Sequence, residues 1–280
     1  MNRLPSIGRI TLGVVFACSA SLVASAQSSN LKDSIAENEQ KLAEVRADKN
    51  TREVVSELNV LGSLYRLAGQ LEKALTYLNE ALPIEQRASS LYGQATTLDT
   101  MGRIYTDLGQ EDKALSTLNQ ALPMWRALGQ RTGEADTFNY IGKVYNDLGQ
   151  HDDALKFLNE SMTIWQQADN PASGSGSRSN ISVAGEAGTL DNLGRTYSDE
   201  GQGEAALGYF NKALPLYNEI NERGGVALVL NDMGPAYAGI GQKQKALESY
   251  NKAIETWRAL GSREGEALTL NNIGDRKSVV

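Results

Sequence analysis

Polar side chains that could bind peptide groups recur at one place in a repeating pattern along this chain. Each stands three residues before a glycine: Asn59, Asp99, Asn139, Asp191, Asn231 and Asn271. The residue directly after that glycine is a cation in three cases, namely Arg103, Lys143 and Arg195. Asn and Asp are indifferent helix formers, so their recurrence in a helical pattern needs a cause.

The sequence offers little for catalysis. It holds one histidine, His151, and one cysteine, Cys18. These cannot build the usual Ser/His, Cys/His or zinc sites. A phosphate-binding GxxxxGK[ST] loop is also missing from the sequence. We therefore predict a non-catalytic protein without cofactor or metal.

Composition narrows the class of partner. Hydrophobic residues make up 41% and charged residues 22% of the 280, as in ordinary soluble folded proteins. The formal net charge is −7. Nucleic-acid binding needs clustered cationic charge, so we expect a protein or peptide partner and no nucleic acid.

The polar residues are positioned by a 40-residue repeat, which its glycines mark. These are Gly62, Gly102, Gly142, Gly194, Gly234 and Gly274. Their spacings are 40, 40, 52, 40 and 40 residues. The longer spacing contains a 12-residue insertion within residues 168–188, which are rich in Gly and Ser. We predict a flexible surface loop there.

Each unit is predicted to form two helices. In the second unit, Leu98, Met101 and Ile104 recur at helical spacing, and Gly109 suits the left-handed position that ends a helix. A second apolar face follows, with Ala114, Leu118 and Ala121. Small residues at Gly102, Ala114 and Ala121 would let the two helix backbones approach closely.

The Leu–Gly–x–x–Tyr element of the first helix and the Ala–Leu–Ala pattern of the second resemble the tetratricopeptide repeat (TPR) family. The resemblance covers five full repeats and the start of a sixth, within residues 53–274. The longer unit looks like the repeats of kinesin-light-chain-like proteins and of bacterial arrays that precede CHAT domains. It implies an all-α fold, an α-solenoid in which helical hairpins form a right-handed superhelix with first helices lining its concave face.

The resemblance also implies a role for the polar pattern. In that family the position of Asn59 and its equivalents faces the concave groove and can hold an extended peptide. With Arg103, Lys143 and Arg195, these side chains could clamp acidic peptides. The alternative is structural: each Asn or Asp bonds to the neighbouring helix or to its own cation. The sequence leaves both open.

A second repeating position lies near the end of each second helix. Trp125, Trp165 and Trp257 align there with Glu85 and Tyr217. We expect these aromatic residues to pack between adjacent repeats.

The N-terminal segment differs from the repeats. Residues 1–26 combine Arg3 and Arg9 with an apolar run of 15 residues and a small-residue cleavage site, as in a signal peptide. The run is short of the roughly 20 residues of a spanning helix, so we predict an exported, periplasmic or secreted protein. A lipoprotein anchored through Cys18 is the alternative. Residues 27–52 read as a half-repeat that caps the stack.

The C-terminal segment breaks the pattern at Asp275. The hexapeptide "DRKSVV", residues 275–280, matches one reading frame of a common sequencing adapter, and we interpret it as a non-native tail. A sixth first helix cut after about two turns would leave Tyr250, Ile254 and Trp257 exposed, which would permit self-association. We therefore predict a protein-interaction scaffold. The alternative is the recruitment region of a larger effector, such as a CHAT-type peptidase, that bears its catalytic domain elsewhere.

Overall fold

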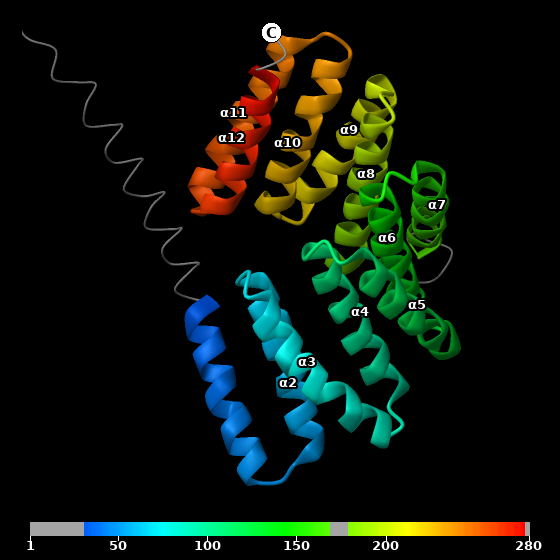
Figure 1. The fold of residues 1–280 in the computed structure, drawn as a ribbon, viewed down its shortest axis with the longest axis vertical. Helices are drawn as coiled ribbons and strands as arrows, with labels where there is room; N and C mark the ends of the chain where they lie inside the picture. Colours follow the sequence, from blue (N-terminus) through cyan, green and yellow to red (C-terminus); the bar gives the residue numbers. More distant parts are fainter. Residues whose placement is uncertain (1–30, 169–178, 278–280) are drawn as a thin grey trace, which may run out of the picture.

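A computed structural model describes residues 31–168 and 179–277, and these residues form helices joined by short turns (Figure 1). A helix over residues 31–47 comes first. The others are α2 (Thr51–Leu67), α3 (Leu71–Arg87), α4 (Leu91–Asp107), α5 (Glu111–Leu128), α6 (Arg131–Asp147), α7 (His151–Ala168), α8 (Asn180–Asp199), α9 (Gly203–Glu219), α10 (Arg223–Gly239), α11 (Lys243–Leu260) and α12 (Arg263–Lys277). The described part of the chain contains no strand, so the all-α prediction is confirmed.

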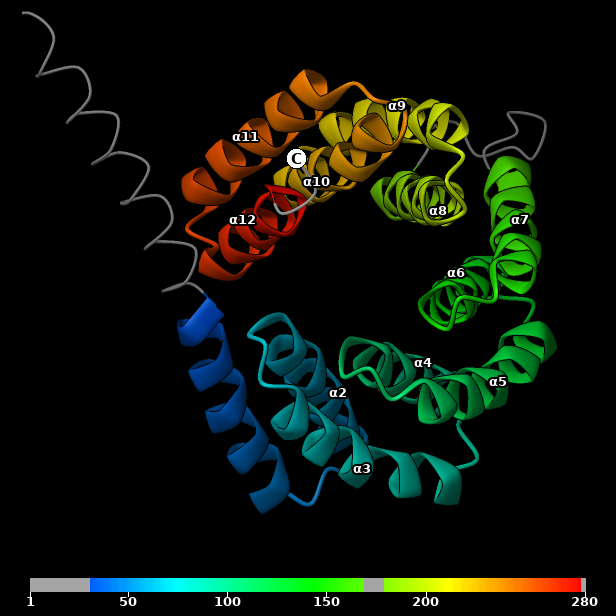
Figure 2. The ribbon, with the colours of Figure 1, turned by 45° about the horizontal axis from the view of Figure 1, so that its top comes forward.

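Consecutive helices pair into antiparallel hairpins, and the hairpins stack into a solenoid. The even-numbered helices α2 to α12 face the centre in Figure 2, and the odd-numbered helices α3 to α11 form the outer wall. The stack curves so far that its ends meet. A Cβ added at Gly69, in the turn after α2, would lie 3.6 Å from the Glu264 Oε1 atom of α12.

Within a hairpin, the marker glycine lets the outer helix approach. A Cβ at Gly102 would lie 2.6 Å from the Leu118 side chain, closer than real contacts allow. The equivalent glycines meet Leu78, Leu158, Phe210 and Tyr250 in the same way. Gly109 and Gly129 have φ of +63° and +65° and end their helices as predicted.

Between hairpins, an aromatic ring packs onto a second glycine. Trp125 lies against Gly133, Trp165 against Gly185, Tyr217 against Gly225 and Trp257 against Gly265. The tryptophans are buried, so their predicted packing between repeats is confirmed. We call this space, between the last turns of an outer helix and the glycine of the next inner helix, the aromatic slot.

The helix over residues 31–47 covers the first hairpin. Its Ile35, Leu42 and Val45 side chains are buried in one cluster with Leu58 and Leu78. This is the contact that a capping half-repeat would make.

The predicted loop over residues 168–188 is wrong for its last nine residues. α8 begins at Asn180, with the Ser179 side chain accepting a hydrogen bond from the Ser182 backbone N–H. Gly185 and Ala187 are helical because they pack on the preceding hairpin, as Gly133 and Ala135 do in α6. Residues 169–178 lie outside the described residues.

The predicted exposure at the last hairpin is also wrong. α12 begins at Arg263, before the expected start of the sixth repeat, and therefore spans 15 residues. Tyr250, Ile254 and Trp257 are buried, with Trp257 packed on Gly265 of α12. Residues 275–277 of the proposed non-native tail continue α12, while residues 278–280, the signal-peptide residues and Cys18 lie outside the described residues.

Candidate functional site

The repeating Asn and Asp side chains lie on the inner helices, and the structure places most of them between helices. Asp99, Asn139, Asp191 and Asn231 are buried, Asn59 is half-buried, and Asn271 is exposed. The position three residues before the marker glycine therefore faces the next inner helix more than the open groove.

At the first two repeat contacts, the partner is a threonine. Asn59 Oδ1 accepts a hydrogen bond from Thr97 Oγ1 at 2.7 Å. Asp99 Oδ1 accepts one from Thr137 Oγ1 at 2.9 Å. Each threonine precedes its own marker glycine by five residues, so both bonds join equivalent positions of adjacent repeats.

At two later contacts, the partner is an asparagine. Asn139 Oδ1 accepts from Asn192 Nδ2 at 2.9 Å, and Asn231 Oδ1 accepts from Asn272 Nδ2 at 3.0 Å. Asn192 and Asn272 each precede their marker glycine by two residues. These bonds correspond to the structural alternative, and the groove role of the same side chains stays a prediction.

The contact between the fourth and fifth repeats differs, because two carboxylates meet there. Asp191 is 8% exposed, and its Oδ1 atom has no hydrogen-bond partner among the described residues. Burial, and then the charge of Asp232, raises the pKa of Asp191 well above its ordinary value. Arg195 approaches Asp232 at 3.6 Å and offsets part of this charge.

The three predicted cations are already paired. Arg103 binds its own Asp99 at 2.7 Å and Asp136 at 3.3 Å, and lies over the Tyr140 ring. Lys143 binds Asp147 at 2.9 Å and not Asn139. Arg195 approaches Asp147 and Asp232 at 3.6 Å. In the part of the chain that the structure describes, Arg103 is thus the one cation of the three with an ion pair to the Asn or Asp of its own repeat. Its two carboxylate partners leave it less available for an acidic peptide.

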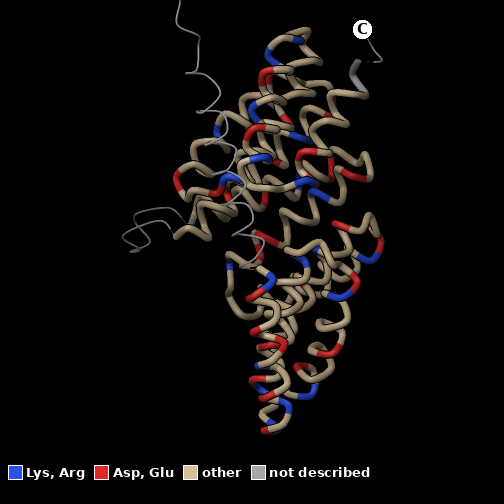
Figure 3. The backbone as a smooth tube through the Cα atoms, turned by 90° about the vertical axis from the view of Figure 1, so that its left-hand side faces the viewer, with Lys and Arg blue, Asp and Glu red and all other residues tan. Residues whose placement is uncertain are grey.

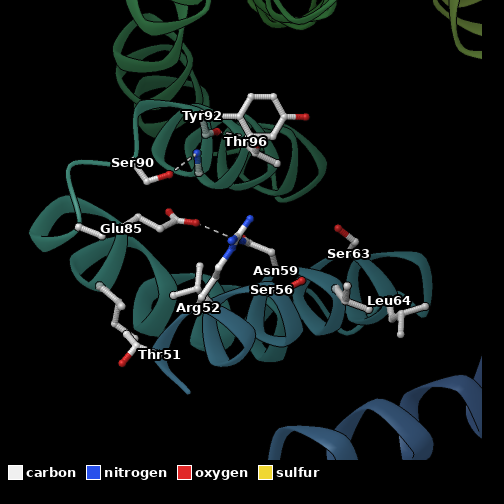
Figure 4. Close-up of a pocket in the computed structure, with 15 residues that line it drawn as sticks. Thr51, Arg52, Ser56, Asn59, Ser63, Leu64, Glu85, Ser90, Tyr92 and Thr96 are labelled. Carbon is white, nitrogen blue, oxygen red and sulfur yellow. Dashed lines mark hydrogen bonds between the residues drawn. The ribbon is translucent and has the colours of Figure 1, made fainter. Parts of the chain in front are cut away.

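A pocket of about 970 Å³ opens between α2, α4 and the end of α3, and the sequence analysis missed it (Figure 4). Its lining residues are Thr51, Arg52, Val55, Ser56, Asn59, Val60, Ser63, Leu64, Ile84, Glu85, Ala88, Ser90, Tyr92, Gly93 and Thr96. Of the predicted site residues, the pocket contains only Asn59. Ligand pockets commonly have volumes of roughly 300–1,000 Å³.

Glu85 is the buried charge of this pocket. Its side chain is 2% exposed, and Oε1 accepts a hydrogen bond from Asn59 Nδ2 at 2.8 Å. Oε2 has no hydrogen-bond partner in the part of the chain that the structure describes. Burial raises the pKa of Glu85, and the hydrogen bond from Asn59 offsets part of this rise. The sequence feature that could have indicated this pocket is Glu85 itself, because the equivalent position holds a tryptophan in three other repeats.

Other chemistry is sparse in the described residues. Within residues 31–168 and 179–277 there is no cluster of His, Cys, Asp and Glu that could hold a metal ion. His151 Nδ1 lies 3.1 Å from Asn146 Oδ1. None of the helices described is long and apolar enough to cross a membrane. Cationic and anionic residues are interspersed along the chain, as Figure 3 shows.

Comparison with known proteins assigns the chain to a family of helical repeats. Tetratricopeptide repeat models match residues 54–127, 135–168 and 185–259. A search of curated protein sequences found no match.

Solved structures are similar in fold at low sequence identity. The complex of NprR with its cognate peptide NprX gives a TM-score of 0.65 at 18% identity, over 89% of this chain and 70% of that one. A Rap protein complexed with competence and sporulation factor gives 0.64 at 15%, over 90% and 76%. The kinesin-light-chain TPR-like repeats of Podosopora anserina give 0.52 at 17%, over 74% and 95%.

Proposed function

Because the chain belongs to the tetratricopeptide repeat family, we propose that it is a protein-interaction scaffold that binds a peptide or protein segment along its inner face. The observation that carries the proposal is the continuous inner wall formed by one helix from each repeat (Figure 2). This wall is hollowed by a pocket of about 970 Å³ between α2 and α4. Extended rigid surfaces of this kind suit an extended or helical segment of another protein.

Two of the similar structures support the choice of a peptide. NprR was solved with its cognate peptide, and a Rap protein with competence and sporulation factor. Their identity to this chain is 18% and 15%, so they support the fold and leave the ligand of this chain open.

The experiment is a selection of random displayed peptides on the immobilised full chain, followed by photo-cross-linking of the enriched peptides. We expect cross-links on the even-numbered helices α2 to α12. Scrambled versions of the same peptides are the control. Cross-links confined to the odd-numbered outer helices, or no enrichment over the control, would contradict the proposal.

Self-association is a second candidate, and one observation favours it. Leu270 of α12 is 47% exposed, whereas its equivalents Leu58, Leu98, Phe138 and Leu190 are buried. Leu270→Glu should then lower the mass measured by light scattering at high concentration. A wild-type chain that stays monomeric at every concentration would contradict this candidate.

Export also stays a proposal, because it depends on residues 1–26. Expression of the full gene and fractionation of the cells test it. We expect a mature chain that begins at Gln27 outside the cytoplasm, and an uncleaved cytoplasmic chain would contradict it.

A further inference from the structure

The pocket beside Glu85 lies where the other repeats have an aromatic side chain. In each repeat, the residue 23 positions after the marker glycine stands at the aromatic slot: Glu85, Trp125, Trp165, Tyr217 and Trp257. The first repeat still has the slot's glycine, Gly93. A Cβ at Gly93 would lie 2.8 Å from Glu85 Oε1, where the Gly133 Cβ would meet the Trp125 ring. The first slot therefore keeps the glycine that receives an aromatic ring in the other repeats, but the side chain beside that glycine is a smaller, charged glutamate.

The remaining space is apolar with a charged floor. Val55, Val60, Leu64 and Ile84 supply aliphatic walls. Tyr92 stands at the rim, where its ring packs edge-on against Trp125 at a centroid distance of 5.5 Å. The Glu85 carboxylate closes the floor, with one oxygen held by Asn59 and the other without a donor.

A carboxylate that lacks a donor in a buried site is costly, and an occupant that supplies a charged donor removes this cost. The aliphatic walls suit a side chain that carries its charge at the end of methylene groups. The Tyr92 ring offers a face for a cation. A neutral or acidic side chain would leave the Glu85 carboxylate without a cation.

We propose that this pocket, which we call the Glu85 pocket, anchors a lysine or arginine side chain of the peptide bound on the inner face. The inference rests on the proposed function. The cation pairs with the Glu85 carboxylate at the floor of the pocket, and its methylene groups pack on the walls. Charged hydrogen bonds of this kind are shorter and stronger than neutral ones.

Arg52 is a second charged side chain at this site. It projects from the first turn of α2 towards Asn59 and Glu85 in Figure 4. Among the described residues it forms no ion pair with Glu85. A cation so close to the pocket competes with an incoming lysine, so its removal should strengthen the binding of a cationic side chain.

The probes are capped pentapeptides, acetyl-Gly-Ser-X-Ser-Gly-amide, in which X is lysine, arginine, norleucine or glutamate. Methyl NMR signals of Val55, Val60, Leu64 and Ile84 in the full chain report on the pocket. We expect saturable shifts with lysine and arginine, and binding at least about tenfold weaker with norleucine and glutamate. Equal binding of the norleucine and lysine peptides would overturn the proposal.

Variants test the role of each charge. Glu85→Gln should weaken lysine-peptide binding about tenfold or more, because it removes the ionic acceptor. Glu80→Gln on the exposed side of α3 is the matched control and should change nothing. Arg52→Gln should tighten binding. Glu85→Trp should abolish the methyl shifts while circular dichroism shows an unchanged helical fold, and unchanged binding to Glu85→Gln would overturn the proposal.

The two proposals fail in different ways. Library peptides that cross-link to the inner helices without shifting the pocket methyl signals would retain the scaffold and overturn the Glu85 pocket. Pentapeptides that bind the pocket while no library peptide is enriched would retain the pocket and contradict the scaffold.

Discussion

The contact between the first and second repeats and the contact between the second and third share one backbone arrangement and differ in the aromatic slot. In the second contact, the Trp125 ring fills the slot against Gly133. In the first, Glu85 occupies the same register against Gly93, and a pocket of about 970 Å³ remains. Both contacts keep the polar bond between inner helices, Asn59 to Thr97 and Asp99 to Thr137.

Trp125 and Glu85 occupy equivalent positions of their repeats and have different effects on the contact. A tryptophan there contributes buried apolar area and holds adjacent hairpins together. A glutamate contributes little packing and carries the cost of a buried charge. The first contact is thus less tightly packed, and it retains a concave space with apolar walls and a buried carboxylate.

The largest effect is expected from Trp125→Ala. It should lower the free energy of unfolding by about 3–5 kcal/mol, because it leaves a cavity in a packed contact. Glu85→Ala should cost far less, since the first slot is already open. Urea unfolding followed by circular dichroism measures both, and equal losses would show that the two slots are equally filled.

The glycines of the two slots sharpen the comparison. Gly133→Ala should destabilise the protein by about 1–3 kcal/mol, because its Cβ would lie 2.6 Å from the rigid Trp125 ring. Gly93→Ala meets the end of the flexible Glu85 side chain, and a helical alanine is favoured over glycine. We expect it to be neutral or stabilising in thermal melts. A loss at Gly93 as large as that at Gly133 would contradict the open first slot.

A carboxylate in place of Asn59 tests the hydrogen bonds of the first contact, which join Asn59 to Glu85 and to Thr97. Asn59→Asp would replace the Nδ2 donor to Glu85 with a second acid, as at Asp191 and Asp232, and should cost about 1–2 kcal/mol at neutral pH. The matched change, Asp99→Asn, keeps an acceptor for Thr137 and should cost less. Urea unfolding at neutral pH compares them, and the reverse order would contradict the assigned bonds.

The smallest effect is the pH dependence that Glu85 contributes at the first contact. Because burial raises the pKa of Glu85, the folded state holds its proton more tightly than the unfolded state. Its contribution to stability is present below the unfolded pKa and is lost as pH rises through the folded pKa. Wild type should therefore gain stability relative to Glu85→Gln as pH falls from about 7 to about 4. Parallel stability curves for the two proteins would contradict a buried Glu85.

Much of the fold follows from the repeat itself. The marker glycines and the apolar faces around Leu98 and Leu118 predict paired helices, and the observed hairpins have those contacts. The left-handed glycines Gly109 and Gly129 were predictable because few other residues adopt that conformation. The helix starts were not, because Gly185 lies in a Gly- and Ser-rich stretch that predicts a loop. In the structure, Gly185 and Gly265 are helical and each packs against a tryptophan ring.

The candidate site was less predictable. The sequence identifies Asn59, Asn139 and Asn231 as a recurring set, and it cannot give the angle at which one inner helix passes the next. That angle directs their amides towards Thr97, Asn192 and Asn272. Glu85 was visible as an acid aligned with Trp125, but its significance depends on the retained Gly93 and on the empty space above it.

Hydrogen–deuterium exchange of the full chain, with and without a peptide selected on it, tests the central claim most directly. We expect protection of the α2 and α4 backbone amides around the Glu85 pocket, with little change at the Trp125 contact between α5 and α6. Protection that is equal at the two contacts, or confined to the outer helices, would contradict it.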